Sequence, residues 1–182
     1  STYFVFSSDH EELALEHQQY YKMSMYEGSV RVPMLLAGPD IPAGGHTDDL
    51  VSTIDLCPPF MDMGGLEKRR PLDGESLLPP ATGQTTDSRN QAYASFTGTT
   101  MNTSAHMLCR GKWKYIAYVG QPCQLFDLDA DPGELNDLSA DNPEIVDELD
   151  AELRKTVDYE QVHRDWQDYC KSAFRQWRRQ AK

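Results

Sequence analysis

The sequence predicts an α/β fold in which a mixed unit of strands and helices is followed by a small antiparallel sheet and C-terminal helices. Two short apolar runs, residues 3–7 and 32–37, have the length and composition of buried strands. Residues 105–110, 113–119 and 124–129 are three further strand candidates, joined by short links that contain glycine. Such closely spaced strands with turn residues between them are typical of an antiparallel meander.

Two amphipathic helices are expected at the C-terminal end. Asn142 and Pro143 are typical of a helix start. Apolar residues then recur at helical spacing, in a first stripe of Ile145, Val146, Leu149, Leu153 and Val157. A second stripe consists of Val162, Trp166, Tyr169, Cys170, Phe174 and Trp177. We expect both stripes to pack into a core. Residues 67–92 are rich in Pro, Gly, Thr, Asp and Ser and are expected to form a long surface connection.

Composition excludes several classes of protein. The 182 residues are 39% hydrophobic and 25% charged, which is typical of a globular chain. A formal net charge of −12 argues against a basic nucleic-acid surface. No apolar run is long enough to cross a bilayer, so no membrane partner is expected. The four cysteines are widely spaced and form no C-x-x-C pair, which excludes a zinc ribbon.

Three residues near the first strand could form a site for an anion. Asp9 and His10 follow the strand directly, at the edge where ligands bind in open α/β sheets. Asp9 offers oxygen to a divalent cation, and His10 could ligate a metal or contact an anion. Lys22 lies close enough in the sequence to face the same pocket, where a cation and an ammonium together would suit a sulfate or phosphate ester. The alternative is a structural Asp-His pair beside a solvated lysine.

A series of motifs strengthens the first interpretation. They are, in chain order, Asp9-His10, Lys22-Met23-Ser24-Met25-Tyr26-Glu27-Gly28, Arg31-Val32-Pro33, Gly38-Pro39, Trp113-Lys114-Tyr115-Ile116, Gln124-Leu125-Phe126-Asp127-Leu128, Asp131-Pro132 and Glu134-Leu135. Their order resembles that of sulfatases of the alkaline-phosphatase superfamily. The resemblance implies that residues 1–85 are the C-terminal part of the main sulfatase α/β domain. Residues 86–182 would then be the C-terminal subdomain, a small antiparallel sheet with helices.

The resemblance also implies roles for individual residues. Asp9 and His10 are expected to be the second pair of calcium ligands, and Lys22 the lysine that contacts the sulfate. A further group is expected to brace the loop around Lys22, namely Glu16, His17, Tyr26, Glu27 and Arg31. We assign no catalytic residue, because none of the four cysteines lies in the C-x-P-S-R sequence that yields the formylglycine nucleophile. The nucleophile and the first pair of metal-binding aspartates are expected before residue 1, and the isolated chain is expected to be inactive.

The expected activity is hydrolysis of a sulfuric ester in a glycosaminoglycan or an aryl sulfate. The segment 16–27 resembles sulfatases that remove the 2-sulfate of a uronate. Membership implies a lysosomal or secreted glycoprotein, and the sequon Asn102-Thr103-Ser104 is the expected glycosylation site. Two alternatives stay open. One is a phosphodiesterase or phosphonate hydrolase of the same superfamily. The other is a non-catalytic sulfatase-like binding protein, suggested by Glu11, where the family usually has glycine.

Overall fold

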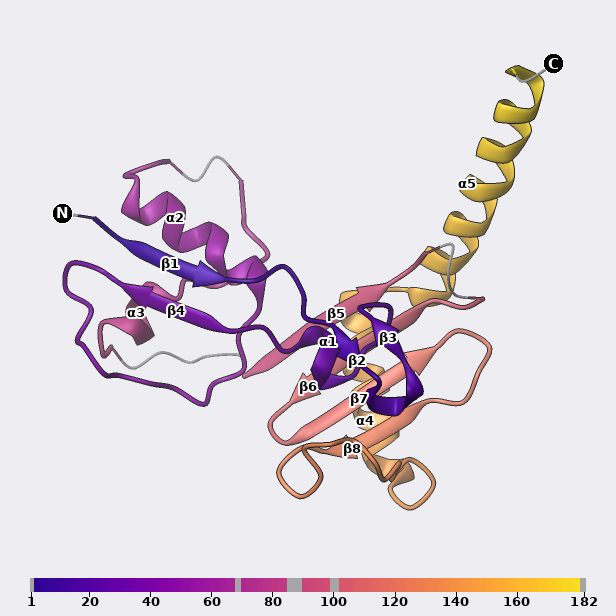
Figure 1. Ribbon diagram of the computed structural model, residues 1–182, viewed down its shortest axis with the longest axis horizontal. Coiled ribbons are helices and arrows are strands. Elements are labelled where there is room, and N and C mark those ends of the chain that lie inside the picture. Colours follow the sequence, from indigo (N-terminus) through magenta and orange to yellow (C-terminus); the bar gives the residue numbers. More distant parts are fainter. Residues whose placement is uncertain (1, 68–69, 85–89, 99–101, 181–182) are drawn as a thin grey trace.

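The computed structural model describes residues 2–67, 70–84, 90–98 and 102–180. Its N-terminal part contains a two-stranded antiparallel sheet in which β1 (Phe4–Ser7) pairs with β4 (Met34–Ala37). The helices α2 (Cys57–Met63) and α3 (Leu78–Ala81) lie beside this sheet (Figure 1). The predicted α/β class is confirmed. The predicted boundary between residues 85 and 86 falls outside the described residues and stays a prediction.

A four-stranded antiparallel sheet forms the centre of the rest of the molecule. Its strands follow one another in the order β5 (Gln91–Phe96), β6 (Ala105–Arg110), β7 (Trp113–Tyr118) and β8 (Gln124–Asp127). The predicted meander of three strands is therefore confirmed. β5 was missed, because it begins inside the stretch that its polar composition assigned to a surface connection. That stretch also contains the short helix α3.

Both faces of this sheet are covered. The helix α4 (Pro143–Thr156) packs Leu149 and Leu153 against one face, together with Leu108 and Leu125. The first amphipathic stripe is therefore a core stripe, as predicted. A segment from the N-terminal part covers the other face. It contains β2 (Leu13–Ala14), β3 (Tyr20–Tyr21) and α1 (Glu27–Val30), and its buried residues Leu13, Met25 and Tyr26 join Ala105, Met107, Cys109, Ile116 and Phe126.

The second amphipathic stripe does not pack as predicted. The helix α5 (Tyr159–Gln180) extends away from the sheet (Figure 1), and Tyr169, Phe174 and Trp177 are 63%, 59% and 61% exposed. Only its first turns reach the sheet, where Tyr159 is buried and Nδ1 of His163 lies 2.9 Å from Oγ of Ser104. The stripe is real, but no surface among the described residues covers its C-terminal half.

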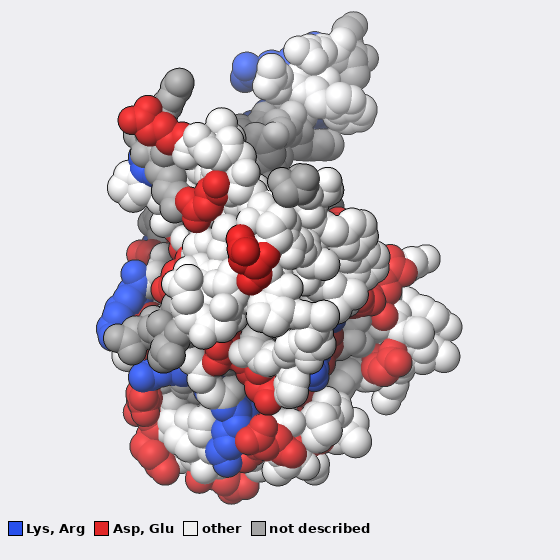
Figure 2. All heavy atoms as spheres, turned by 90° about the vertical axis from the view of Figure 1, so that its left-hand side faces the viewer, with Lys and Arg blue, Asp and Glu red and all other residues white. Residues whose placement is uncertain are grey.

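The two-stranded sheet is also more open than expected. Phe4, Phe6 and Leu35 are exposed, so β1 is not the fully buried strand that its composition indicates. Figure 2 looks onto this end of the molecule and shows a broad area without charged side chains, interrupted by a few acidic residues. In the described part of the chain, no helix has the length and hydropathy required to span a membrane.

Two short 3-10 turns complete the described structure. β2 is followed by η1 (Glu16–Gln18). A second turn, η2 (Thr53–Leu56), leads into α2. All four cysteines lie in the described part and are free. Cys109 and Cys123 pack into the cores on opposite faces of the sheet, which accounts for the absence of a disulfide between them.

Candidate functional site

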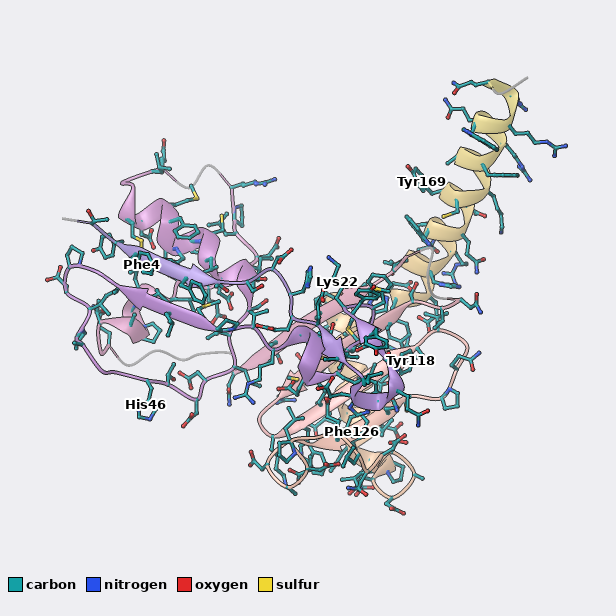
Figure 3. The ribbon with its side chains drawn as sticks, in the orientation of Figure 1. Phe4, Lys22, His46, Tyr118, Phe126 and Tyr169 are labelled. Atoms are coloured by element: carbon teal, nitrogen blue, oxygen red, sulfur yellow. The ribbon has the colours of Figure 1, made fainter. Side chains whose placement is uncertain are left out.

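The three residues predicted to form a site lie together. Nζ of Lys22 is 2.5 Å from Nε2 of His10, and Nε2 of His10 is 3.5 Å from Oδ2 of Asp9. All three side chains line an open cavity of about 2030 Å³. Figure 3 shows Lys22 between the two-stranded sheet and the four-stranded sheet. The structure therefore brings a carboxylate, an imidazole and an ammonium to one solvent-accessible place.

Local hydrogen bonds orient His10 after β1 ends. Oγ of Ser8 donates to the carbonyl oxygen of His10 over 2.7 Å. Nδ1 of His10 lies 3.1 Å from the carbonyl oxygen of Glu11, so Nδ1 carries the proton in the neutral ring. Nε2 then presents its lone pair to the ammonium of Lys22. The same lone pair is the one that a metal ion would use.

An unusual backbone segment connects His10 to Lys22. Leu15, His17, Gln18 and Tyr21 all have positive φ, at 93°, 53°, 57° and 70°. Non-glycine residues adopt such values rarely and at a cost of about 1–3 kcal/mol each, and they concentrate at functional sites. The His17 ring stacks on Tyr26 with 3.7 Å between ring centroids and 6° between planes, which holds this segment against the buried side of the loop.

The residues expected to brace the loop do so in several ways. The hydroxyl of Tyr26 lies 3.2 Å from Oε1 of Gln124 in β8, and its ring packs near Phe126. Oε2 of Glu16 accepts the backbone N–H of Ala14 at 2.5 Å. Nη1 of Arg31 lies 3.7 Å from Oε2 of Glu27. These contacts fix the course of the chain on both sides of Lys22.

Two bracing residues were not identified from the sequence. Lys114 in β7 is completely buried, and its ammonium lies 2.7 Å from Oε1 of Glu27 and 2.7 Å from Oε1 of Glu134. Oε2 of Glu134 accepts the backbone N–H of Glu27 at 2.6 Å. Lys114 belongs to one of the motifs that carry the resemblance. Its position in a predicted strand was the only sequence signal noted, and its burial depends on the cover of both sheet faces that the structure shows.

Asp9 and His10 are suited to share one cation, although they cannot surround it. Two adjacent ligands at about 2.4 Å from one ion are separated by about 3.4 Å, close to the spacing of Asp9 Oδ2 and His10 Nε2. The Asp9 side chain is 86% exposed, so its oxygens are free to bind. The described residues contain no cluster of three or more His, Cys, Asp or Glu that could hold a metal. Among the described residues, Asp9 and His10 are thus at most two ligands of such a cation.

The site can hold an anion but has no evident group to break its ester bond. The ammonium of Lys22 can neutralise charge on sulfate oxygens, and His10 can orient that ammonium. The core thiol of Cys109 lines the same cavity but is buried, and burial raises its pKa to about 12, so it is not a nucleophile at neutral pH. The geometry of Lys22 and His10 therefore suits the binding of an anion.

The predicted glycosylation sequon lies at the start of β6. Asn102 is exposed, whereas Ser104 is buried. Oγ1 of Thr103 donates to the carbonyl oxygen of Val119 over 2.7 Å, which ties the sequon to the end of β7. The acceptor side chain is therefore accessible on a well-anchored segment.

Comparisons with known proteins identify the family of this chain. The family described as N-sulphoglucosamine sulphohydrolase, C-terminal, matches residues 15–162. Arylsulfatase K of Xenopus laevis is 40% identical over 188 residues, covering 97% of this chain and 35% of the relative. The chain thus spans about a third of the length of the curated relatives it matches.

Solved structures give the same result. A 2-O GAG sulfatase is 27% identical with a TM-score of 0.78, covering 85% of this chain and 35% of that one. The phosphonate monoester hydrolase of Agrobacterium radiobacter is 26% identical with a TM-score of 0.73, covering 84% and 34%. The family match over most of the chain and the likeness to arylsulfatase K together show that this chain belongs to the N-sulphoglucosamine sulphohydrolase C-terminal family of sulfatases.

Proposed function

We propose that this chain supplies the substrate-binding half of the active site of a sulfuric ester hydrolase. The observation that carries the proposal is the convergence of Lys22, His10 and Asp9 on one open cavity. The likeness to arylsulfatase K over nearly the whole chain supports it. The nucleophile is proposed to come from the part of the protein that corresponds to the remaining length of these relatives.

Each residue of the site has a distinct proposed role. Lys22 places its ammonium against the sulfate oxygens and stabilises the charge that accumulates on them during sulfuryl transfer. Asp9 and His10 ligate calcium together with groups outside this chain. When bound, the ion would withdraw charge from the sulfate oxygens as a Lewis acid.

The proposed substrate is a glycosaminoglycan chain that ends in a 2-sulfated uronate. The likeness to arylsulfatase K and to a 2-O GAG sulfatase supports this choice. The formal net charge of −12 disfavours binding along an anionic polymer, whereas one ammonium and a cation attract an anion at short range. Recognition is therefore confined to the terminal residue. The chain would act in the lysosome or outside the cell, with Asn102 glycosylated.

Hydrolysis of a phosphonate or phosphodiester is a second candidate. The structural likeness to a phosphonate monoester hydrolase favours it, because both ester types need the same neutralisation of oxygen charge. The segment from Lys22 to Gly28 favours the sulfatase. A non-catalytic binding protein is the remaining alternative, for which Glu11 beside the metal pair is the local argument.

Substrate competition tests the proposal. The full-length protein is given oligosaccharides that end in 2-sulfated glucuronate, 2-sulfated iduronate or 6-sulfated hexosamine, and an aryl phosphonate in parallel. Release of sulfate from a 2-sulfated uronate is the expected result. Preference for the hexosamine would refute the uronate while keeping the sulfatase, and preference for the phosphonate would refute the sulfatase. Calcium binding without turnover of any ester would support the binding protein.

A further inference from the structure

A buried group of charges lies on the protein side of the candidate site. Lys114 is fully buried and contacts the carboxylates of Glu27 and Glu134 at 2.7 Å each. Glu134 also accepts the backbone N–H of Glu27, the first residue of α1. Arg31, at 3.7 Å from Glu27, adds a second positive charge at the outer edge. Two cations and two carboxylates therefore balance, and they fix the start of α1 to β7.

The residue that links α1 to the site is Ser29. Its side chain is 2% exposed, and Oγ donates to the carbonyl oxygen of Lys22 over 2.8 Å. Its own carbonyl oxygen accepts the backbone N–H of Glu11 at 2.9 Å. Ser29 thus holds the two segments that carry Lys22 and His10. A Cβ at Gly28 would lie only 2.8 Å from Leu13 Cδ2, so α1 also packs closely against β2.

We propose that Lys114 and Ser29 are positioning residues for Lys22 and His10. Lys114 fixes α1 through Glu27 and Glu134, and Ser29 transmits that position to both site segments. The inference rests on the proposed function, because it assumes that Lys22 binds the sulfate. The ammonium of a long, exposed lysine side chain is placed more precisely when the backbone of that lysine is fixed. Displacements of about 1 Å in an active site can reduce rates by about a hundredfold.

A purely structural role makes a different prediction. Loss of folded protein would lower activity by the same factor whether or not Lys22 is present. A residue that acts through Lys22 has an effect only while Lys22 is present, because the two share one interaction. The double-mutant cycle between Ser29 and Lys22 separates the two roles.

The experiment measures kcat/KM for an aryl sulfate with the full-length protein and with Ser29→Ala, Lys22→Ala and the double variant. We expect Ser29→Ala to lower kcat/KM about tenfold alone and less than about twofold in the Lys22→Ala background. Equal losses in both backgrounds would overturn the positioning role. A Lys22→Ala variant with normal turnover would instead refute the proposed function, so the two failures are distinguishable.

Lys114 is tested by a second pair of variants. Lys112 also lies near β7 and pairs with Asp127 at 2.5 Å, but its partner is not on α1. In hydrogen exchange, Lys114→Met should increase exchange of the Glu11 amide more than that of the β7 amides, whereas Lys112→Met should leave the Glu11 amide unchanged. If Lys114→Met increases exchange uniformly, the link from Lys114 to the site is contradicted. If that variant does not fold, the Ser29 cycle decides alone.

Discussion

Lys114 and Glu27 are 87 residues apart in the sequence, yet Nζ of the fully buried lysine lies 2.7 Å from Oε1 of the partly buried glutamate. This ion pair joins the segment that carries the candidate site to the central sheet. The site loop and the C-terminal sheet therefore form one structural unit, and a change in the sheet is expected to reach the site.

Removing the buried ammonium should destabilise the chain strongly. Lys114→Met leaves the buried carboxylate of Glu134 and the partly buried carboxylate of Glu27 without their shared cation, which is expected to cost about 3–5 kcal/mol. Lys112→Met is the matched control, because Lys112 is half-exposed, and it should cost about 1 kcal/mol or less. Urea denaturation of the 182-residue chain measures both. Equal losses for the two variants would show that the buried group contributes no more than a surface pair.

Loss of the Asp9 carboxylate should weaken calcium binding and leave the fold intact. Asp9 is exposed, so Asp9→Asn removes a charged ligand without disturbing a core. Isothermal titration of the full-length protein with calcium should show at least about a tenfold rise in Kd. Asp141→Asn, in the exposed turn before α4, is the control and should bind as the parent does. Unchanged affinity in the Asp9 variant would remove Asp9 from the metal site.

Acid should destabilise the chain in part through His106. Burial lowers the pKa of His106 from its ordinary 6.5, Glu160 opposes the shift and His163 adds to it. Nδ1 contacts the Tyr93 hydroxyl at 3.0 Å, and Nε2 is buried without a hydrogen-bond partner. His106 therefore binds a proton more readily in the unfolded chain than in the folded one. Its contribution to the free energy of unfolding is fully present above about pH 6.5 and is lost as the pH falls below that value.

The variant His106→Leu tests this. Free energies of unfolding are measured at about pH 7.5 and about pH 5. The parent should lose more stability between these two values than the variant, because the variant has no buried imidazole to protonate. An equal loss in both proteins would assign the acid sensitivity to other groups.

The sequence predicted correctly those elements whose local residue pattern indicates the same structure as their packing in the fold. The strand at residues 105–110 has the predicted bounds because the turn at Gly111 ends it and its face of Ala105, Met107 and Cys109 is apolar. Asp9, His10 and Lys22 were identified because their motifs keep a fixed order, and the structure brings them together. Local sequence patterns are sufficient to predict an element when its structure depends only on a neighbouring turn or strand.

The remaining features depend on contacts that no local pattern contains. The α5 stripe predicts an apolar face, but its periodicity cannot tell whether another surface reaches Phe174 or Trp177. In the sequence, Lys114 is an ordinary lysine of a predicted strand. Only the folded structure brings Glu134, 20 residues later, and Glu27 into contact with it. Long-range pairing of charges is a property of the folded chain, which explains why this part of the site was missed.

The central claim is that Lys22 contacts the sulfate, and one measurement tests it most directly. In the full-length protein, kcat/KM for an aryl sulfate is compared between the parent, Lys22→Ala and the control Lys155→Ala, an exposed lysine of α4 that pairs with Glu152 and does not line the cavity. Loss of a charge-stabilising group worth about 3 kcal/mol should lower kcat/KM about a hundredfold or more in Lys22→Ala. The control should stay within about threefold of the parent. Near-parental turnover by Lys22→Ala would contradict the claim and place the sulfate elsewhere.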